Sequence, residues 1–155
     1  MKKVYTTTMI NTGGRSGESH SPNHSFNVNI EEPGSKTEGT NPEELFAAGY
    51  SACFNSALDY IKRAKNIRGN SIIKVRVSLY NQSKESVPDV VLGVEIEGFI
   101  ANLSLSKVQE LLDEAHQVCP YSRATRGNIS VTVQAVPEIQ ISPRKPFTLK
   151  QVAGT

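Results

Sequence analysis

Apolar residues at every second position mark several short stretches of the chain, a spacing typical of β-strands with one buried face. The first stretch covers residues 4–10 and the second covers residues 26–30. Between them, the glycines of residues 12–17 indicate a turn. Residues 31–40 are rich in Glu, Pro, Gly, Ser and Lys, which predicts a loop. The amino-terminal part is therefore expected to form two strands.

Two later stretches, residues 73–79 and 92–97, alternate in the same way. The positions between their apolar residues are charged, with opposite signs in the two stretches: Lys74, Arg76, Glu95 and Glu97. Opposite charges on one face favour antiparallel neighbours, and each pair contributes a few tenths to about 1 kcal/mol. Residues 129–133 alternate once more and predict a final strand.

A run of fourteen uncharged residues, from Leu45 to Leu58, belongs to a predicted helix. Asn41 is a good N-cap, Pro42 suits the first helical position, and the two acids that follow favour the positive helix end. To about Arg63 the residues are apolar or small all round, which is typical of a helix buried on every side. A chain of 155 residues can hardly bury so long a helix alone, so we expect an obligate dimer.

A second helix is predicted from Ser106, where Gln109 completes a capping-box pattern. Its apolar positions share one face: Val108, Leu111, Leu112, Ala115 and Cys119. Pro120 disfavours helical geometry at the preceding residue, so this helix should end at Cys119. Residues 126–128 then predict a turn. The order ββαββαβ indicates an α+β fold with antiparallel sheet.

Composition is ordinary for a globular protein, with 37% hydrophobic and 21% charged residues, and the length suits one domain. The net charge of +2 comes from scattered basic residues with few aromatic neighbours, which argues against nucleic acid as a partner. Polar residues 6–8 stand where a signal peptide would be apolar, and the uncharged run is too short to cross a bilayer. We therefore expect a cytoplasmic protein with no membrane partner.

The two cysteines, Cys53 and Cys119, are the first candidates for chemistry. In the absence of a secretion signal they are either simply buried or redox-active. Cys53 lies in the uncharged helix, where a thiol has a raised pKa and is inert unless a cation approaches it. Cys119 lies at the negative end of a helix, which disfavours a thiolate and suits attack on an already oxidised sulfur. Each also fits a plain core cysteine.

Arg15, in its glycine-rich loop, is the candidate cation, and Glu43 could hold it through a bidentate ion pair. The alternatives are an exposed turn arginine and an acid that interacts only with the helix dipole. Glu43 and Cys53 are ten residues apart, or about 15 Å along a straight helix. Either the helix bends near Gly49, or the glutamate comes from the other subunit, which we favour. Helical phase alone leaves Glu44 as another partner for Arg15.

The histidines give no sign of a metal site. His20 and His24 share a polar segment and His116 lies on the second predicted helix, without the close spacing of zinc ligands. The glycine-rich loop has no helix directly after it, so a phosphate-binding loop is also poorly supported. We expect no bound metal.

Three segments resemble the organic hydroperoxide resistance proteins (Ohr) of the OsmC/Ohr superfamily. Residues 40–54, TNPEELFAAGYSACF, resemble the segment around the first cysteine of that family. Residues 118–129, VCPYSRATRGNI, resemble the second-cysteine segment, and residues 13–17, GGRSG, resemble the arginine loop. The resemblance covers about residues 2–136 and decides for Glu43 over Glu44 as the partner of Arg15.

The resemblance implies an OsmC-like fold, with antiparallel sheets around a buried central helix, in an intertwined homodimer with both sites at the interface. It implies a thiol-dependent peroxidase that reduces organic hydroperoxides and protects against oxidative stress. By motif position, Cys53 is the peroxidatic cysteine and Cys119 the resolving cysteine. Arg15 and Glu43 would be the activating pair.

In that chemistry, a Cys53 sulfenic acid condenses with Cys119 to a disulfide, which an external dithiol reduces. The family's reductant is typically a lipoyl group on a protein, and no bound cofactor is implied. The apolar surface around Phe46, Tyr50 and Phe54 is expected to receive the alkyl tail of the substrate. An OsmC-type peroxidase of broader preference, and a redox-sensing or ligand-binding module without turnover, remain as alternatives.

Two features depart from the family pattern. Arg123 stands where relatives commonly have Asn, which is expected to change the charge near Cys119. Residues 137–155 extend beyond the usual end of the family, so we divide the chain into a domain at 1–136 and an extension. The role of the extension is open. Its alternatives are an edge strand of the sheet and a contact with a neighbouring molecule.

Overall fold

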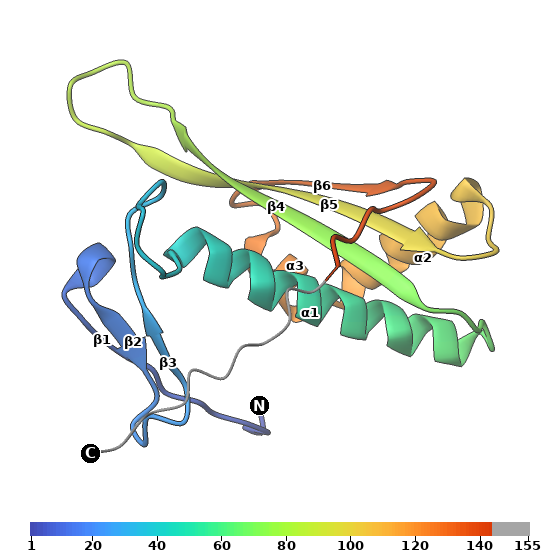
Figure 1. Ribbon diagram of the computed structural model, residues 1–155. Helices are drawn as coiled ribbons and strands as arrows, with labels where there is room; N and C mark the ends of the chain where they lie inside the picture. Colours follow the sequence, from blue (N-terminus) through green and yellow to red (C-terminus); the bar gives the residue numbers. More distant parts are fainter. Residues whose placement is uncertain (144–155) are drawn as a thin grey trace.

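The computed structural model describes residues 1–143, which form a mixed sheet, a small second sheet and three α-helices (Figure 1). Its elements in chain order are β1 Ile10–Thr12, η1 Gly14–Ser16, β2 Glu18–His20, β3 Asn27–Asn29, α1 Pro42–Ala64, β4 Ser71–Asn81, β5 Val90–Ile100, α2 Leu105–Val118, α3 Pro120–Thr125 and β6 Ser130–Ala135, of which η1 is a single 3₁₀ turn. The α+β class is confirmed.

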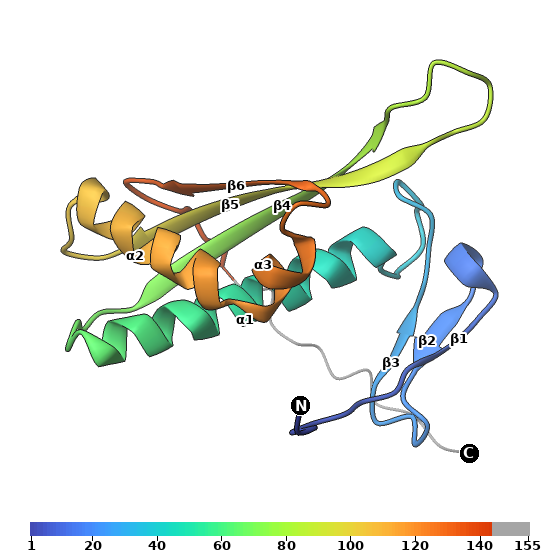
Figure 2. The same cartoon turned by 180° about the vertical axis from the view of Figure 1, so that it is seen from behind.

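The larger sheet has the strand order β4-β5-β6, and the three helices cover one of its faces (Figures 1 and 2). The core lies between these layers and holds the apolar face of α2 as predicted. The expectation of a wholly antiparallel sheet is wrong, because β6 runs parallel to β5. A parallel neighbour needs a crossover connection, which α2 and α3 supply here.

The outer face of this sheet carries the predicted charge ladder. Strands β4 and β5 are antiparallel, and their register sets Lys74 opposite Glu97 and Arg76 opposite Glu95. Lys74 Nζ lies 2.6 Å from Glu97 Oε2, and Arg76 pairs with Glu95. The antiparallel pairing that the opposite charges predicted for these two strands is therefore confirmed.

Helix α1 begins as predicted, with the Asn41 side chain accepting a hydrogen bond from the Glu44 amide and Pro42 in the first position. Within one chain it buries a single face, where Tyr50 and Phe54 are fully buried. The opposite face, with Ala48 and Ala52, lies at the surface. Burial on every side is therefore not achieved by one chain, and the dimer stays a prediction.

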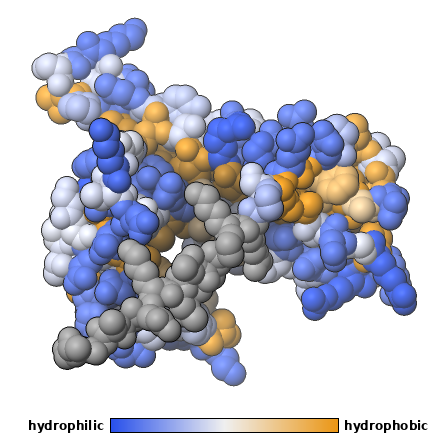
Figure 3. All heavy atoms as spheres, in the orientation of Figure 1, coloured by the Kyte–Doolittle hydropathy of each residue, from blue (hydrophilic) through white to orange (hydrophobic). Residues whose placement is uncertain are grey.

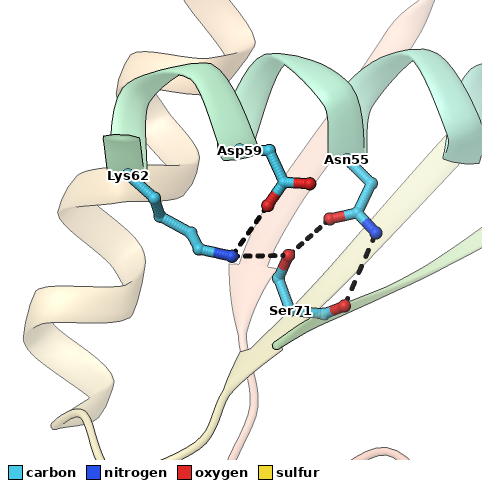
Figure 4. A network of polar contacts seen from close by, with 4 residues as sticks. All are labelled: Asn55, Asp59, Lys62 and Ser71. Atoms are coloured by element: carbon cyan, nitrogen blue, oxygen red, sulfur yellow. Dashed lines mark hydrogen bonds and ion pairs between the residues drawn. The ribbon is translucent and has the colours of Figure 1, made fainter. Parts of the chain in front are cut away.

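A polar network fixes the second half of α1 to the start of β4 (Figure 4). The Lys62 side chain is only 6% exposed, and its ammonium lies 2.8 Å from Asp59 Oδ1 and 3.2 Å from Ser71 Oγ. Ser71 in turn donates to Asn55 Oδ1 at 2.6 Å. The buried charge is thus paired and hydrogen-bonded, as burial of a lysine requires.

The amino-terminal residues differ most from expectation. A small antiparallel sheet, β1-β2-β3, lies beside the start of α1 (Figure 1). The predicted strand at residues 4–10 is wrong for a single chain, since only Ile10 joins this sheet and the Val4 and Tyr5 side chains are exposed. Strand β2 was missed because its residues Glu18–His20 are polar and show no alternation.

The second helix begins one residue before the predicted position. Ser104 is its N-cap and accepts from the Lys107 amide, so the capping box at Ser106 is wrong. Gln109 instead contacts β6, where its Oε1 accepts from the Ala135 amide at 2.8 Å. Residues 137–143 form no strand in the described part, and the rest of the predicted extension lies outside the described residues.

Candidate functional site

Cys53 and Cys119 lie close together on the side of the helices that faces the core. Cys53, on α1, and Cys119, between α2 and α3, have their Sγ atoms 3.6 Å apart as free thiols. Cys119 is fully buried, whereas Cys53 is partly exposed. A disulfide needs an S–S distance of about 2.05 Å, so a shift of about 1.5 Å separates this pair from a bond. Cys53 is the sulfur that solvent can reach.

Cys119 occupies the break between two helices. It is the C-cap of α2, and Pro120 directly begins α3, which the sequence pattern did not predict. The proline holds Cys119 in an extended conformation, with φ −59° and ψ 124°. Cys119 therefore lies at the start of α3 as well as at the end of α2. The prediction that it lies only at the negative end of a helix, where a thiolate is disfavoured, is weakened. Arg123 is exposed on α3.

Burial raises the pKa of the Cys53 thiol, and the neighbouring Cys119 raises it further. The backbone amide of Tyr121, in the first turn of α3, acts in the opposite direction and lowers this pKa. No cation of the described chain contributes. In the surroundings that residues 1–143 provide, the thiol form of Cys53 is therefore favoured over the nucleophilic thiolate.

A mainly apolar pocket of about 450 Å³ opens at Cys53. No charged side chain lines it, and its walls are formed by Cys53, Ser56, Ala57, Tyr60, Val118 and Pro120. Its four α1 residues recur at steps of three and four, so helical phase counted from Cys53 predicts them. The substrate-binding residues predicted from the sequence do not include those of this pocket.

The residues predicted to bind substrate lie elsewhere. Tyr50 and Phe54 are fully buried, and Phe46 lines a separate hollow with Val90 and Ile129. None of the three lines the pocket at Cys53. Their contact with a substrate stays a prediction.

Phe46 and Tyr50 instead form an aromatic cluster with Tyr121. The Tyr121 ring centroid lies 5.5 Å from that of Tyr50 and 6.0 Å from that of Phe46. A Cβ on Gly49 would come within 2.7 Å of the Tyr121 hydroxyl, so glycine at this position lets Tyr121 lie against α1. Tyr121 thus joins α3 to the helix of Cys53, a role that sequence reasoning missed although the residue follows Cys119-Pro120.

Arg15 and Glu43 form the predicted bidentate ion pair. Arg15 Nη1 donates to Glu43 Oε2 at 2.9 Å, and Nη2 donates to Oε1 at 2.7 Å. The turn that presents Arg15 requires positive φ at Gly13 and Gly14, which are 80° and 62°. Glu44 instead accepts from Thr40, so the choice of Glu43 is confirmed.

The hydrogen bond from Arg15 holds the pKa of Glu43 below its usual value, and the same bond raises the pKa of Arg15. The glutamate that Arg15 contacts belongs to its own chain, and the expectation that Glu43 reaches Cys53 from the other subunit stays a prediction. Helix α1 is continuous across Gly49, which leaves Glu43 about 15 Å along the axis from Cys53. A single chain therefore separates its ion pair from its reactive sulfur.

The histidines form no shared site. The rings of His20 and His24 stack with centroids 4.0 Å apart, while His116 lies on α2. Among residues 1–143, no group of three or more His, Cys, Asp or Glu side chains is placed to hold a metal ion. Within the same residues, no helix has the length and apolar character needed to cross a membrane.

Comparison with known proteins agrees with the motif resemblance. The family model described as OsmC-like protein matches residues 34–134. Organic hydroperoxide resistance protein-like 2 of Staphylococcus epidermidis is 42% identical over 133 residues, covering 83% of this chain and 92% of that protein. Organic hydroperoxide resistance protein OhrB of Bacillus subtilis is 40% identical over 134 residues, covering 84% and 97%.

Solved structures agree as well. The crystal structure of OhrB of Bacillus subtilis matches with a TM-score of 0.78 and 38% identity, covering 85% of this chain and 98% of that one. A structure of an organic hydroperoxide resistance protein from Legionella pneumophila matches with a TM-score of 0.78 and 35% identity, covering 86% and 98%. The fold is therefore shared over most of the chain.

Proposed function

Because the chain belongs to the OsmC-like family and is similar to organic hydroperoxide resistance proteins, we propose that it is a thiol-dependent peroxidase that reduces organic hydroperoxides. In this role it protects against oxidative stress. The observation that carries the proposal is the 3.6 Å approach of a buried Cys119 to a Cys53 that opens into an apolar pocket. This arrangement supplies one sulfur for attack and a second for resolution.

In the first step the Cys53 thiolate attacks the terminal oxygen of the hydroperoxide. The O–O bond breaks, the sulfur gains oxygen as a sulfenic acid, and the organic fragment leaves as an alkoxide that takes a proton to become an alcohol. The pocket supports an alkyl hydroperoxide as substrate, since each buried CH₂ group contributes about 0.8 kcal/mol to binding. Hydrogen peroxide has no such group to bury.

In the second step the Cys119 sulfur attacks the Cys53 sulfenic acid. A Cys53–Cys119 disulfide forms and one water molecule leaves, which carries away the oxygen and the thiol proton. An external dithiol such as a lipoyl group on a partner protein then reduces the disulfide and becomes a cyclic disulfide itself. No bound cofactor takes part in this cycle.

Activation of Cys53 requires a positive charge that residues 1–143 of its own chain do not supply. We infer a homodimer in which Arg15 and Glu43 of the partner subunit complete the site around Cys53. Its support is the separation of the ion pair from Cys53 within one chain, together with the uncharged face of α1 that lies at the surface. Figure 3 shows apolar side chains at the surface on the side that carries α1 and β4. Such a surface favours contact with a second protein molecule.

A steady-state assay tests the function. With an alkyl hydroperoxide and dihydrolipoamide, we expect many turnovers per site, and a much lower kcat/KM when hydrogen peroxide replaces the alkyl hydroperoxide. Equal rates with both peroxides would favour the OsmC-type peroxidase of broader preference. Oxidation that stops after one equivalent, with no reduction by dihydrolipoamide, would favour a redox-sensing module and contradict the proposal.

A further inference from the structure

A chain of buried hydrogen bonds surrounds Cys119 without including its sulfur. Tyr50 and Ser122 are fully buried, and the Tyr50 hydroxyl donates to Ser122 Oγ at 3.0 Å. Ser122 Oγ lies 2.8 Å from His116 Nδ1. The Tyr50 hydroxyl also lies 3.3 Å from Thr125 Oγ1. Side chains from α1, α2 and α3 thus meet in one hydrogen-bonded chain.

The positions of these residues relative to the cysteines are regular. His116 precedes Cys119 by three residues and Ser122 follows it by three, so their hydrogen bond bridges the break that contains the cysteine. Tyr50 precedes Cys53 by three residues on α1 and lies on the same side of that helix. The chain therefore connects the backbone that carries one sulfur to the backbone that carries the other.

The hydrogen bonds have a consistent direction. Tyr50 donates to Ser122, which leaves the Ser122 hydroxyl proton for His116 Nδ1 when the imidazole is neutral. Burial lowers the pKa of His116, and the nearby Arg126 lowers it further, which favours this neutral form. Arg126 adds a second bridge across the break by donating to the His116 carbonyl oxygen at 2.7 Å.

We propose that the His116–Ser122–Tyr50 hydrogen-bonded chain positions the Cys119 sulfur for disulfide formation and so sets the rate of resolution rather than the rate of peroxide attack. The proposal rests on the resolving role of Cys119 given above. These are positioning residues, since they act through Cys119 and, within residues 1–143, none of their hydrogen bonds includes either sulfur. Misplacement of a reacting group by about 1 Å can cost about 100-fold in rate, and the two sulfurs have about 1.5 Å to close.

The chain offers two informative variants and a matched control. Ser122→Ala removes the central hydroxyl and breaks both of its hydrogen bonds. Tyr50→Phe removes the contacts that α1 makes with Ser122 and Thr125 but leaves the His116–Ser122 bridge across the break, so its effect on Cys119 should be smaller. Ser51→Ala is the control, because it also removes one hydroxyl, but from a side chain of α1 that bonds only its own helix, to the Ala48 carbonyl oxygen.

The test is stopped-flow oxidation of the reduced full-length protein by tert-butyl hydroperoxide. In the wild type we expect a fast phase proportional to peroxide concentration and a slower phase independent of it, the second being disulfide formation. Ser122→Ala should slow the second phase about 10- to 100-fold, by loss of positioning, and leave the first unchanged. Mass spectrometry should find more Cys53 sulfinic acid in this variant at excess peroxide, because the sulfenic acid waits longer for Cys119.

The outcomes separate the two proposals. A wild type that forms no disulfide contradicts the peroxidase cycle itself. If the wild type forms the disulfide, and Ser122→Ala and Tyr50→Phe both form it at the wild-type rate, the positioning role is overturned. Equal slowing of both phases also overturns it, since the chain would then support the helices in general. If Ser122→Ala does not fold, the ratio of the two phases in Tyr50→Phe decides the question.

Discussion

One chain brings its two cysteines together, but it does not bring its Arg15–Glu43 pair to Cys53. Cys53 and Cys119 are brought to 3.6 Å by the packing of α1, α2 and α3 within a single chain. The ion pair is equally well formed, yet it lies at the start of α1, about 15 Å along the helix axis from the sulfur it should activate. The comparison teaches that the described part of one protomer brings the two sulfurs together but does not bring a cation to Cys53, so the proposed cycle needs a second subunit only for activation.

The largest effect is expected from the cysteines themselves. Cys53→Ser should reduce turnover of an alkyl hydroperoxide to the uncatalysed background, because no other sulfur in the site opens to solvent. Cys119→Ser should still oxidise once and then accumulate sulfinic acid at Cys53, as nothing traps the sulfenic acid. Thiol titration and intact-mass measurement after one equivalent of peroxide distinguish the two variants. Turnover retained by Cys53→Ser would sink the assignment of the peroxidatic residue.

The next effect tests whether activation comes from the other subunit. Arg15→Met alone should lower kcat/KM about 100- to 1,000-fold, the usual loss when one group that stabilises a charge in the transition state is removed. When Arg15→Met and Cys53→Ser chains are unfolded and refolded together, mixed dimers should regain one complete site. Random mixing then gives about a quarter of the wild-type sites.

The mixing experiment has a clear contrary result. If Arg15 served Cys53 of its own chain, a mixed dimer would hold no complete site, and the activity of the mixture would stay at the level of the variants. The matched control mixes Arg15→Met with Glu43→Gln chains. These two variants damage the same ion pair in both subunits, so their mixture should not recover wild-type activity at either site.

Sequence reasoning succeeded where the signal was local. Asn41 and Pro42 fixed the start of α1, and the charge ladder fixed the pairing of β4 with β5. The choice of Glu43 depended on motif position rather than on helical phase. These features depend on neighbouring residues or on a regular alternation, so no knowledge of the rest of the fold was needed.

Other features depend on contacts between distant segments. The parallel pairing of β6 follows from the crossover through α2 and α3, which no alternation reveals. Pro120 marked the end of α2 correctly, but proline also suits a first helical position, so α3 was missed. A Glu43 from the other subunit was predicted from the distance between Glu43 and Cys53 along one helix. In the structure Arg15 lies beside Glu43 of its own chain, so both members of the ion pair are distant from Cys53 of that chain.

A smaller effect should separate binding of the substrate tail from the chemistry of the sulfurs. Ser56 lines the pocket at Cys53 with an exposed side chain, and Ser56→Phe should fill part of it. We expect kcat/KM for a bulky alkyl hydroperoxide to fall about 10-fold, the usual discrimination by an apolar pocket. The rate with hydrogen peroxide should not change. Phe46→Ala, which alters the separate hollow, is the comparison variant, and a larger loss there would restore the original prediction for substrate binding.

The smallest effect concerns the stability that the Arg15–Glu43 pair gives to its loop. The pKa of Glu43 is lowered in the folded chain, so its contribution is fully present above the unfolded pKa of about 4.3 and is lost as pH falls through the lowered folded value. Because the Arg15 side chain is 41% exposed and screened by solvent, we expect only a small contribution of the pair to the free energy of unfolding. Urea unfolding of the wild type and Glu43→Gln should therefore differ at pH 7 and converge in acid. A difference that persists in acid strong enough to protonate Glu43 in the folded chain as well would mean that Glu43 stabilises the chain by packing rather than by its charge.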